Sequence, residues 1–102
     1  MDEKQLDALV GAWPGVSSDV KWQDDRVYSV AGKMFAVYCF RGSNAGQVSF
    51  KVGQERFLDL TDRHGVIPAP YMARAHWVSV LASSDMPRDE LLALLRGSYE
   101  QV

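Results

Sequence analysis

Three short runs of strand-forming residues, separated by glycine-containing turns, are the strongest constraint on the fold of this 102-residue chain. The runs span residues 27–30, 34–40 and 47–52, and the last of them alternates apolar and polar side chains. β-Branched and aromatic residues favour strands, and short glycine turns favour pairing between consecutive strands. Alternation gives a strand one apolar and one polar face, as in an antiparallel sheet that helices cover on one side. The pattern therefore predicts an antiparallel meander.

Amphipathic spacing predicts helices around this sheet. Asp2 and Gln5 form a capping-box pattern ahead of a helix over about residues 3–12, and we expect Trp13 to pack against the core. A short helix is expected from Phe57 to near His64. A closing helix follows Pro87 and carries an apolar stripe made of Leu91, Leu95, Tyr99 and Val102.

The remaining segments complete an α+β fold. Residues 15–26 are polar and turn-rich, so we expect a connection with at most one helical turn, at Ser17–Val20. Val66-Ile67 is expected to be extended, Pro70 to open a turn that ends at Arg74, and residues 77–81 to form a later strand. The sequence thus predicts one domain over residues 1–102, with a sheet of about four to five strands flanked by N- and C-terminal helices.

The composition and the cysteine content of the chain indicate where the protein is located in the cell. A chain of this length with 47% hydrophobic residues can bury one core without a disulfide or metal. Its lone cysteine, Cys39, lies within a predicted strand, which indicates a buried, reduced thiol. No signal-peptide core follows Met1, and no apolar run reaches the roughly 18 residues of a membrane span. We therefore expect a cytoplasmic protein that does not enter a membrane.

Residues that support catalysis or metal binding do not form a recognisable pattern in this sequence. His64, His76 and Cys39 are the only imidazole and thiol groups, and their spacing matches no metal motif. Asp24-Asp25 lies in a turn-rich stretch, and Cys39 is expected to be a core residue rather than a nucleophile. The glycine-rich stretch 42–46 lacks the spacing of a nucleotide-binding loop. The sequence therefore predicts a non-enzymatic protein without a metal or cofactor.

Cationic and aromatic residues recur in an order that suits nucleic-acid binding, although the net charge is −2. Such side chains can contact phosphates and stack on bases, and equally they can pack against one another for stability. If Trp77 faces outward from its strand, it shares a surface with Lys33 and Lys51, while Val78 and Val80 face the core. The set comprises Lys21, Trp22, Lys33, Lys51, Arg56, Tyr71, Arg74, His76 and Trp77.

Several of these residues lie in motifs that resemble the MmcQ/YjbR family of small bacterial proteins. The similarity extends from about Leu6 to Val102. Its most specific parts are Gly32-Lys33-Met34-Phe35-Ala36 and Pro68-Ala69-Pro70-Tyr71. The other matching pieces are Pro14-Gly15-Val16, Ser49-Phe50-Lys51-Val52, His76-Trp77-Val78 and Ser98-Tyr99.

The resemblance implies a CyaY-like α+β fold and a DNA-binding function, the latter by analogy with the "double wing" domain of a phage transcription factor. It supplies no catalytic residues. Lys33 and Lys51 match its lysine-bearing motifs, and Tyr71 and Trp77 its aromatic ones. We therefore expect contact with double-stranded DNA through Lys21, Lys33, Lys51 and Arg74, with Tyr71 or Trp77 as a stacking surface.

Two alternatives stay open at this point. The same aromatic and cationic residues are typical of an adaptor surface that binds a protein or a small ligand. The two prolines before Tyr71 can also serve only to stiffen a crossover, with the tyrosine ring filling the core.

Overall fold

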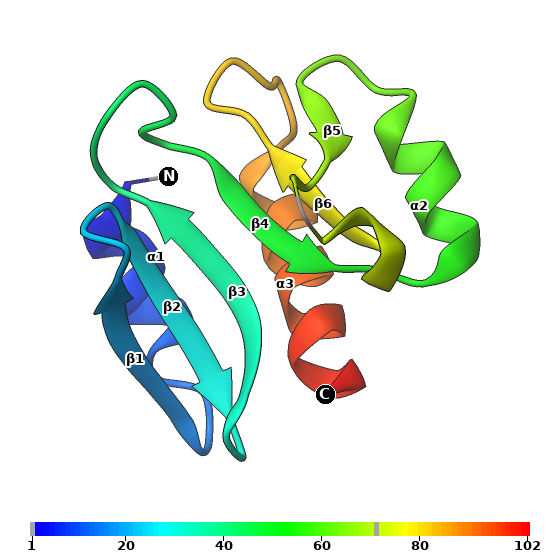
Figure 1. Ribbon diagram of the computed structural model, residues 1–102. Coiled ribbons are helices and arrows are strands. Elements are labelled where there is room, and N and C mark those ends of the chain that lie inside the picture. The colour runs from blue at the N-terminus through cyan, green and yellow to red at the C-terminus, as the bar shows by residue number, and fades with distance from the viewer. Residues whose placement is uncertain (1, 71) are drawn as a thin grey trace.

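The computed structural model describes residues 2–70 and 72–102, and within them a six-stranded antiparallel sheet is accompanied by three α-helices. The sheet order is β1-β2-β3-β4-β6-β5 (Figure 1). Tyr71 lies outside the described residues. The elements are α1 (Glu3–Val10), β1 (Val16–Lys21), β2 (Asp25–Val30), β3 (Lys33–Cys39), β4 (Val48–Lys51), α2 (Gln54–Thr61), β5 (Val66–Pro68), the 3₁₀ turn η1 (Ala73–Ala75), β6 (Trp77–Val80) and α3 (Arg88–Gln101).

The antiparallel meander is confirmed, and one further strand precedes it. Residues 16–21, expected to be a connection, form β1 and pair with all six residues of β2. The expectation was wrong because β1 is an edge strand with five of its six residues exposed, so it lacks the apolar pattern that marks a buried strand. Its structure comes from pairing with β2 rather than from its own composition.

Helix boundaries shift for local reasons. Asp2 caps α1, and its carboxylate accepts a hydrogen bond from the Gln5 amide at 2.8 Å in the predicted capping box. The helix ends at Val10 instead of residue 12 because Gly11 follows it as the C-cap. α2 begins at Gln54, three residues before the expected start, and the turn expected to end at Arg74 is the 3₁₀ turn η1.

The inner face of the sheet contains the core. Tyr28, Ala36, Phe50 and Val78 lie in one register row across four strands, and each is buried. α1 and α3 lie behind the sheet, and α2 lies beside β5 and β6 (Figure 1). Leu6, Leu60 and Leu95 contribute one buried side chain from each helix. Because side chains alternate along a strand, the neighbouring rows point away from α1 and α3.

We call this second side of the sheet the outer face. One of its rows crosses five strands through Val27, Val37, Ser49, Ser79 and Ile67. The hydroxyl oxygens of Ser49 and Ser79 lie 2.7 Å apart in a hydrogen bond, which satisfies the buried Ser79 side chain. The outer face is therefore a mixed apolar and polar surface.

Candidate nucleic-acid interface

Lys51 and Trp77 are directly opposite each other on β4 and β6, in the outer-face row next to Ser49 and Ser79. This confirms that the two side chains share one face of the sheet. The expected exposure of Trp77 is wrong, because only 4% of the residue is accessible to solvent. The chain before β6 turns back on the strand, and the Trp77 amide donates to the Met72 carbonyl at 3.3 Å. The indole is thus a packing group rather than a surface for base stacking.

Lys51 is held at the corner where β4 meets η1. Its Nζ donates to the carbonyl oxygen of Ala75 at 2.7 Å, and its backbone amide donates to Ser98 Oγ at 3.0 Å. Arg74 directly precedes Ala75 in η1 and is exposed. The ammonium–carbonyl bond therefore brings two of the predicted phosphate-binding residues to one corner of the molecule.

The sheet topology divides the predicted site. The β2–β3 turn, the end of β4 and the start of β6 lie at one end of the antiparallel sheet, whereas the β1–β2 turn lies at the other (Figure 1). Lys33, at the start of β3, is exposed and lies at the same end as Lys51 and Arg74. It pairs with Val30, however, which is in an inner-face row, so the expectation that Lys33 shares a face with Lys51 and Trp77 is wrong. Lys21, the last residue of β1, lies at the opposite end. Tyr71, the other predicted stacking residue, is outside the described residues.

Charge is segregated between the helices and the rest of the chain. The three α-helices, with two residues on either side of each, carry nine of the 13 carboxylates but only five of the 11 cationic side chains, a formal charge of −4. The remaining strands and connections carry six cationic side chains and four carboxylates, a charge of +2. Those four carboxylates belong to Asp19, Asp24, Asp25 and Asp85, none of which lies at the end of the sheet that contains Lys33.

Ion pairs neutralise some of these charges. Each of the four ion pairs found among residues 2–70 and 72–102 uses a carboxylate on an α-helix, namely Glu3, Asp59, Glu90 or Glu100. Their arginine partners are Arg26, Arg56, Arg63 and Arg96. Within that described part, Lys21, Lys33, Lys51 and Arg74 take part in none of these pairs.

Trp22 is the exposed aromatic side chain that the choice of Trp77 overlooked. It lies in the β1–β2 turn beside Lys21, and 66% of it is accessible. Its φ of 54° and that of Gln23, 69°, are in the left-handed region, which is costly for residues other than glycine. A large aromatic residue within a polar, turn-rich stretch was the sequence signal for an exposed ring.

The imidazole and thiol groups offer little for catalysis. Cys39 is partly buried and its Sγ donates to the Arg41 carbonyl at 3.1 Å. Burial raises the pKa of the Cys39 thiol, which disfavours the nucleophilic thiolate. The His76 ring packs against Phe57 with 5.6 Å between centroids. Across the described residues, no three His, Cys, Asp or Glu side chains converge on a point where a metal ion would bind.

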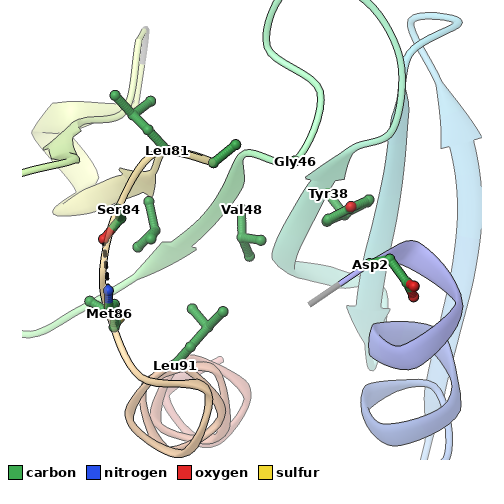
Figure 2. A pocket seen from close by; sticks show the side chains of 10 residues that line it. Asp2, Tyr38, Gly46, Val48, Leu81, Ser84, Met86 and Leu91 are labelled. Atoms are coloured by element: carbon green, nitrogen blue, oxygen red, sulfur yellow. Dashed lines mark hydrogen bonds between the residues drawn. The ribbon is translucent and has the colours of Figure 1, made fainter.

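A pocket of about 400 Å³ opens between the start of α1 and the start of α3 (Figure 2). Its lining is about as polar as it is apolar, and the Asp2 carboxylate and Ser84 hydroxyl are among its polar groups. Ser84 Oγ accepts a hydrogen bond from the Met86 amide at 3.2 Å. Burial raises the pKa of Tyr38, so its phenol remains neutral. The apolar lining comes from Tyr38, Val48, Val80, Leu81, Met86 and Leu91.

These features define a small α+β domain with a helix-covered inner face, an outer face that carries Lys21 and Lys51, and further exposed cationic residues at one end of the sheet. The sequence from residue 11 to residue 101 matches the YjbR family, so the chain belongs to that family. None of the helices in the described residues is long and apolar enough to span a bilayer.

Solved structures agree with the fold. A crystal structure of the Deinococcus radiodurans protein DR2400, with a DUF419 domain, has a TM-score of 0.87 and 26% identity, and the match covers 99% of this chain and 78% of that one. The crystal structure of a Pseudomonas syringae protein has a TM-score of 0.80 and 22% identity, and the match covers 99% of this chain and 98% of that one. A solution NMR structure of a Pseudomonas syringae protein has a TM-score of 0.76 and 21% identity, and the match covers 99% of this chain and 92% of that one. No curated protein matches the chain.

Proposed function

We propose that this protein is a non-enzymatic DNA-binding domain that contacts the duplex through the outer face of its sheet and through exposed cationic residues at the two ends of that sheet. The observation that carries the proposal is the charge segregation: the α-helical segments have a formal charge of −4 and the strands and connections one of +2. Duplex DNA attracts the cationic strands and connections and repels the acidic helical segments, which favours one orientation of the protein even though its net charge is −2.

Phosphate contacts come from Lys33, Lys51 and Arg74 at one end of the sheet. Lys33 and Arg74 are exposed on two different connections. Lys51 uses one ammonium hydrogen for Ala75, which leaves two for a phosphate oxygen. Contacts of this kind position the protein without reading sequence.

The β1–β2 hairpin tip supplies the second part of the interface. Lys21 and Trp22 project from that tip, and Trp22 replaces Trp77 as the stacking or wedge residue. A duplex that reaches both ends of the sheet would run across the row of Val27, Val37 and Ser49.

An NMR amide titration with a short duplex at about 50 mM and about 200 mM salt tests this proposal, because phosphate contacts weaken steeply over that range. The expected shifts cluster at Lys21, Trp22, Lys33, Lys51 and Arg74, and they shrink at the higher salt. Salt-insensitive shifts, or none at the lower salt, would contradict it.

A small-ligand adaptor is the second candidate, and the pocket between α1 and α3 favours it. Ligand sites combine apolar side chains with a few polar groups that orient the ligand. This pocket, whose lining mixes the two, suits a small amphipathic molecule that carries one protonated amine for Asp2. A screen of such amines by NMR distinguishes the candidates, because their shifts would fall on Val48, Met86 and Leu91 on the inner face rather than on the cationic residues.

A further inference from the structure

The two edges of the sheet differ in how well they are protected against pairing with another strand. β5 is a three-residue strand that contains Pro68, and both short length and proline are common protections of an edge. β1 is six residues long, has no proline, and pairs with β2 without a register shift. Five of its six residues are exposed. The β1 edge thus lacks the short length and the proline that protect β5, and its charged residues, Asp19 and Lys21, limit which strand can pair with it.

Exposed apolar side chains lie on this strand, just beyond it and on the helix behind it. Val20 within β1 is 46% exposed and Trp22 just beyond it is 66% exposed. Leu9, which is 36% exposed, lies on α1, the helix behind β1 in Figure 1. Exposed apolar groups next to a free strand edge indicate a surface that a partner covers.

From this edge, we propose that two copies of the chain pair through their β1 strands, antiparallel and about a two-fold axis at Val20. Strand addition at an exposed edge is a recurring mode of recognition, and a two-fold axis makes the same surface serve both copies. In this register Val20 faces the partner's Val20. Asp19 and Lys21, which both lie on the outer face, each face the opposite charge on the other copy.

Charge complementarity selects this register over the adjacent one. Lys21 already lies opposite Asp25 of its own β2, so the partner's Asp19 would place it between two carboxylates. Moving the axis by one residue to Asp19 would set two like charges directly opposite, which is unfavourable. A single strand pair buries less area than a stable dimer requires, so we expect reversible association.

Charge reversal tests the pairing. Sedimentation of the wild-type chain from about 10 µM to about 1 mM should show a monomer–dimer equilibrium typical of small interfaces. Asp19→Lys alone and Lys21→Asp alone should each weaken dimerisation at least about tenfold, and the double variant should restore it to within about threefold. Ile67→Lys at the opposite edge is the matched control and should leave dimerisation unchanged. A wild-type chain that stays monomeric, or a double variant that is not rescued, would overturn the proposal.

Cross-linking tests the register itself. Directly opposite residues have Cα atoms about 4.5–5.5 Å apart, within the spacing that a disulfide needs. In a Cys39→Ala background, Val20→Cys should therefore form a disulfide-linked dimer under mild oxidation. Ser18→Cys and Ile67→Cys should not form such a dimer, because neither residue lies opposite the same residue of the second copy in this register. Equal linkage at Ile67, or preferential linkage at Ser18, would refute the Val20 register.

Discussion

The backbone amide of Lys51 donates to the side-chain hydroxyl of Ser98 at 3.0 Å, and that hydroxyl donates to the Phe35 carbonyl at 2.6 Å. The paired residues Ala36 and Phe50 are the last ladder pair of β3 and β4 at this end, so Ser98 bridges the two positions that follow. A side chain of α3 thereby replaces a strand–strand contact and fixes the backbone of the candidate phosphate-binding lysine.

Replacing Ser98 should be costly because its hydroxyl serves two backbone groups in a fully buried position. Ser98→Ala leaves both without their partner, and we expect a loss of about 2–4 kcal/mol in the free energy of unfolding. Urea denaturation measures it. Ser43→Ala in the exposed β3–β4 loop is the control, with an expected change within about 0.5 kcal/mol. A Ser98 variant as stable as this control would refute the bridging role.

Two glycines with similar backbone angles should respond differently to alanine. Gly65 has a φ of 78° and Gly32 one of 76°. A Cβ at Gly65 would lie 2.6 Å from the Ser84 Cα, whereas at Gly32 it would meet nothing within 4 Å. Gly32→Ala should cost about 1–2 kcal/mol from backbone strain alone. Gly65→Ala should cost at least about 1 kcal/mol more, because Ser84 must move. Equal thermal stabilities of the two variants would contradict this account.

The Arg63–Glu90 pair predicts a small pH-dependent contribution to stability. Arg63 Nη2 donates to Glu90 Oε1 at 2.9 Å, and the guanidinium lowers the pKa of the carboxyl from its usual 4.5. The stabilisation is therefore complete above the unfolded pKa and is lost as the pH falls through the lower, folded pKa. Because both side chains are about one-third exposed, the pair contributes less than about 1 kcal/mol.

Urea unfolding of wild type and Glu90→Gln checks that contribution. At pH 7 the variant should be slightly less stable, and the difference should vanish toward about pH 3. Glu100→Gln, at the exposed Arg96–Glu100 pair, provides the comparison. A stability difference that grows on acidification would have the wrong sign.

Trp77 was expected to be exposed but is buried, whereas Trp22 is exposed, and this difference in burial can be tested. Trp77→Ala should cost about 3–5 kcal/mol, because its side chain is buried. Trp22→Ala should change stability by no more than about 0.5 kcal/mol, since the indole is largely exposed. Acrylamide should quench the Trp22 emission far more than that of Trp77, as read from single-tryptophan variants. Similar quenching of the two would contradict the burial.

A strand could be predicted from the sequence where its own residues favour a strand, and not where it forms only through contacts with distant parts of the chain. The strands around Val37 and Phe50 have buried, β-branched and aromatic neighbours, so their periodicity is strong. β1 forms by pairing at an edge, and nothing in its own composition requires a strand. Trp77 was misread because alternation shows that it shares a face with Ser79 but not that the chain before β6 covers that part of the face.

The candidate site could be predicted from the sequence only in part, for the same reason. The sequence identifies the cationic residues, but only the topology places Lys33 and Arg74 at the same end of the sheet and Lys21 at the other end. Charge segregation is likewise invisible in a net charge of −2, because it depends on which acids lie on the helices.

The affinity for a short DNA duplex as a function of salt tests the central claim most directly. The Lys33→Gln/Arg74→Gln variant removes one exposed lysine and one exposed arginine from the connections, and Lys4→Gln/Arg88→Gln removes the same charges from α1 and α3. We predict that the first double variant lowers the slope of log K against log salt by about two and that the second leaves it nearly unchanged. Equal effects of the two variants, or no binding by the wild-type chain at about 50 mM salt, would contradict the proposed mode of DNA binding.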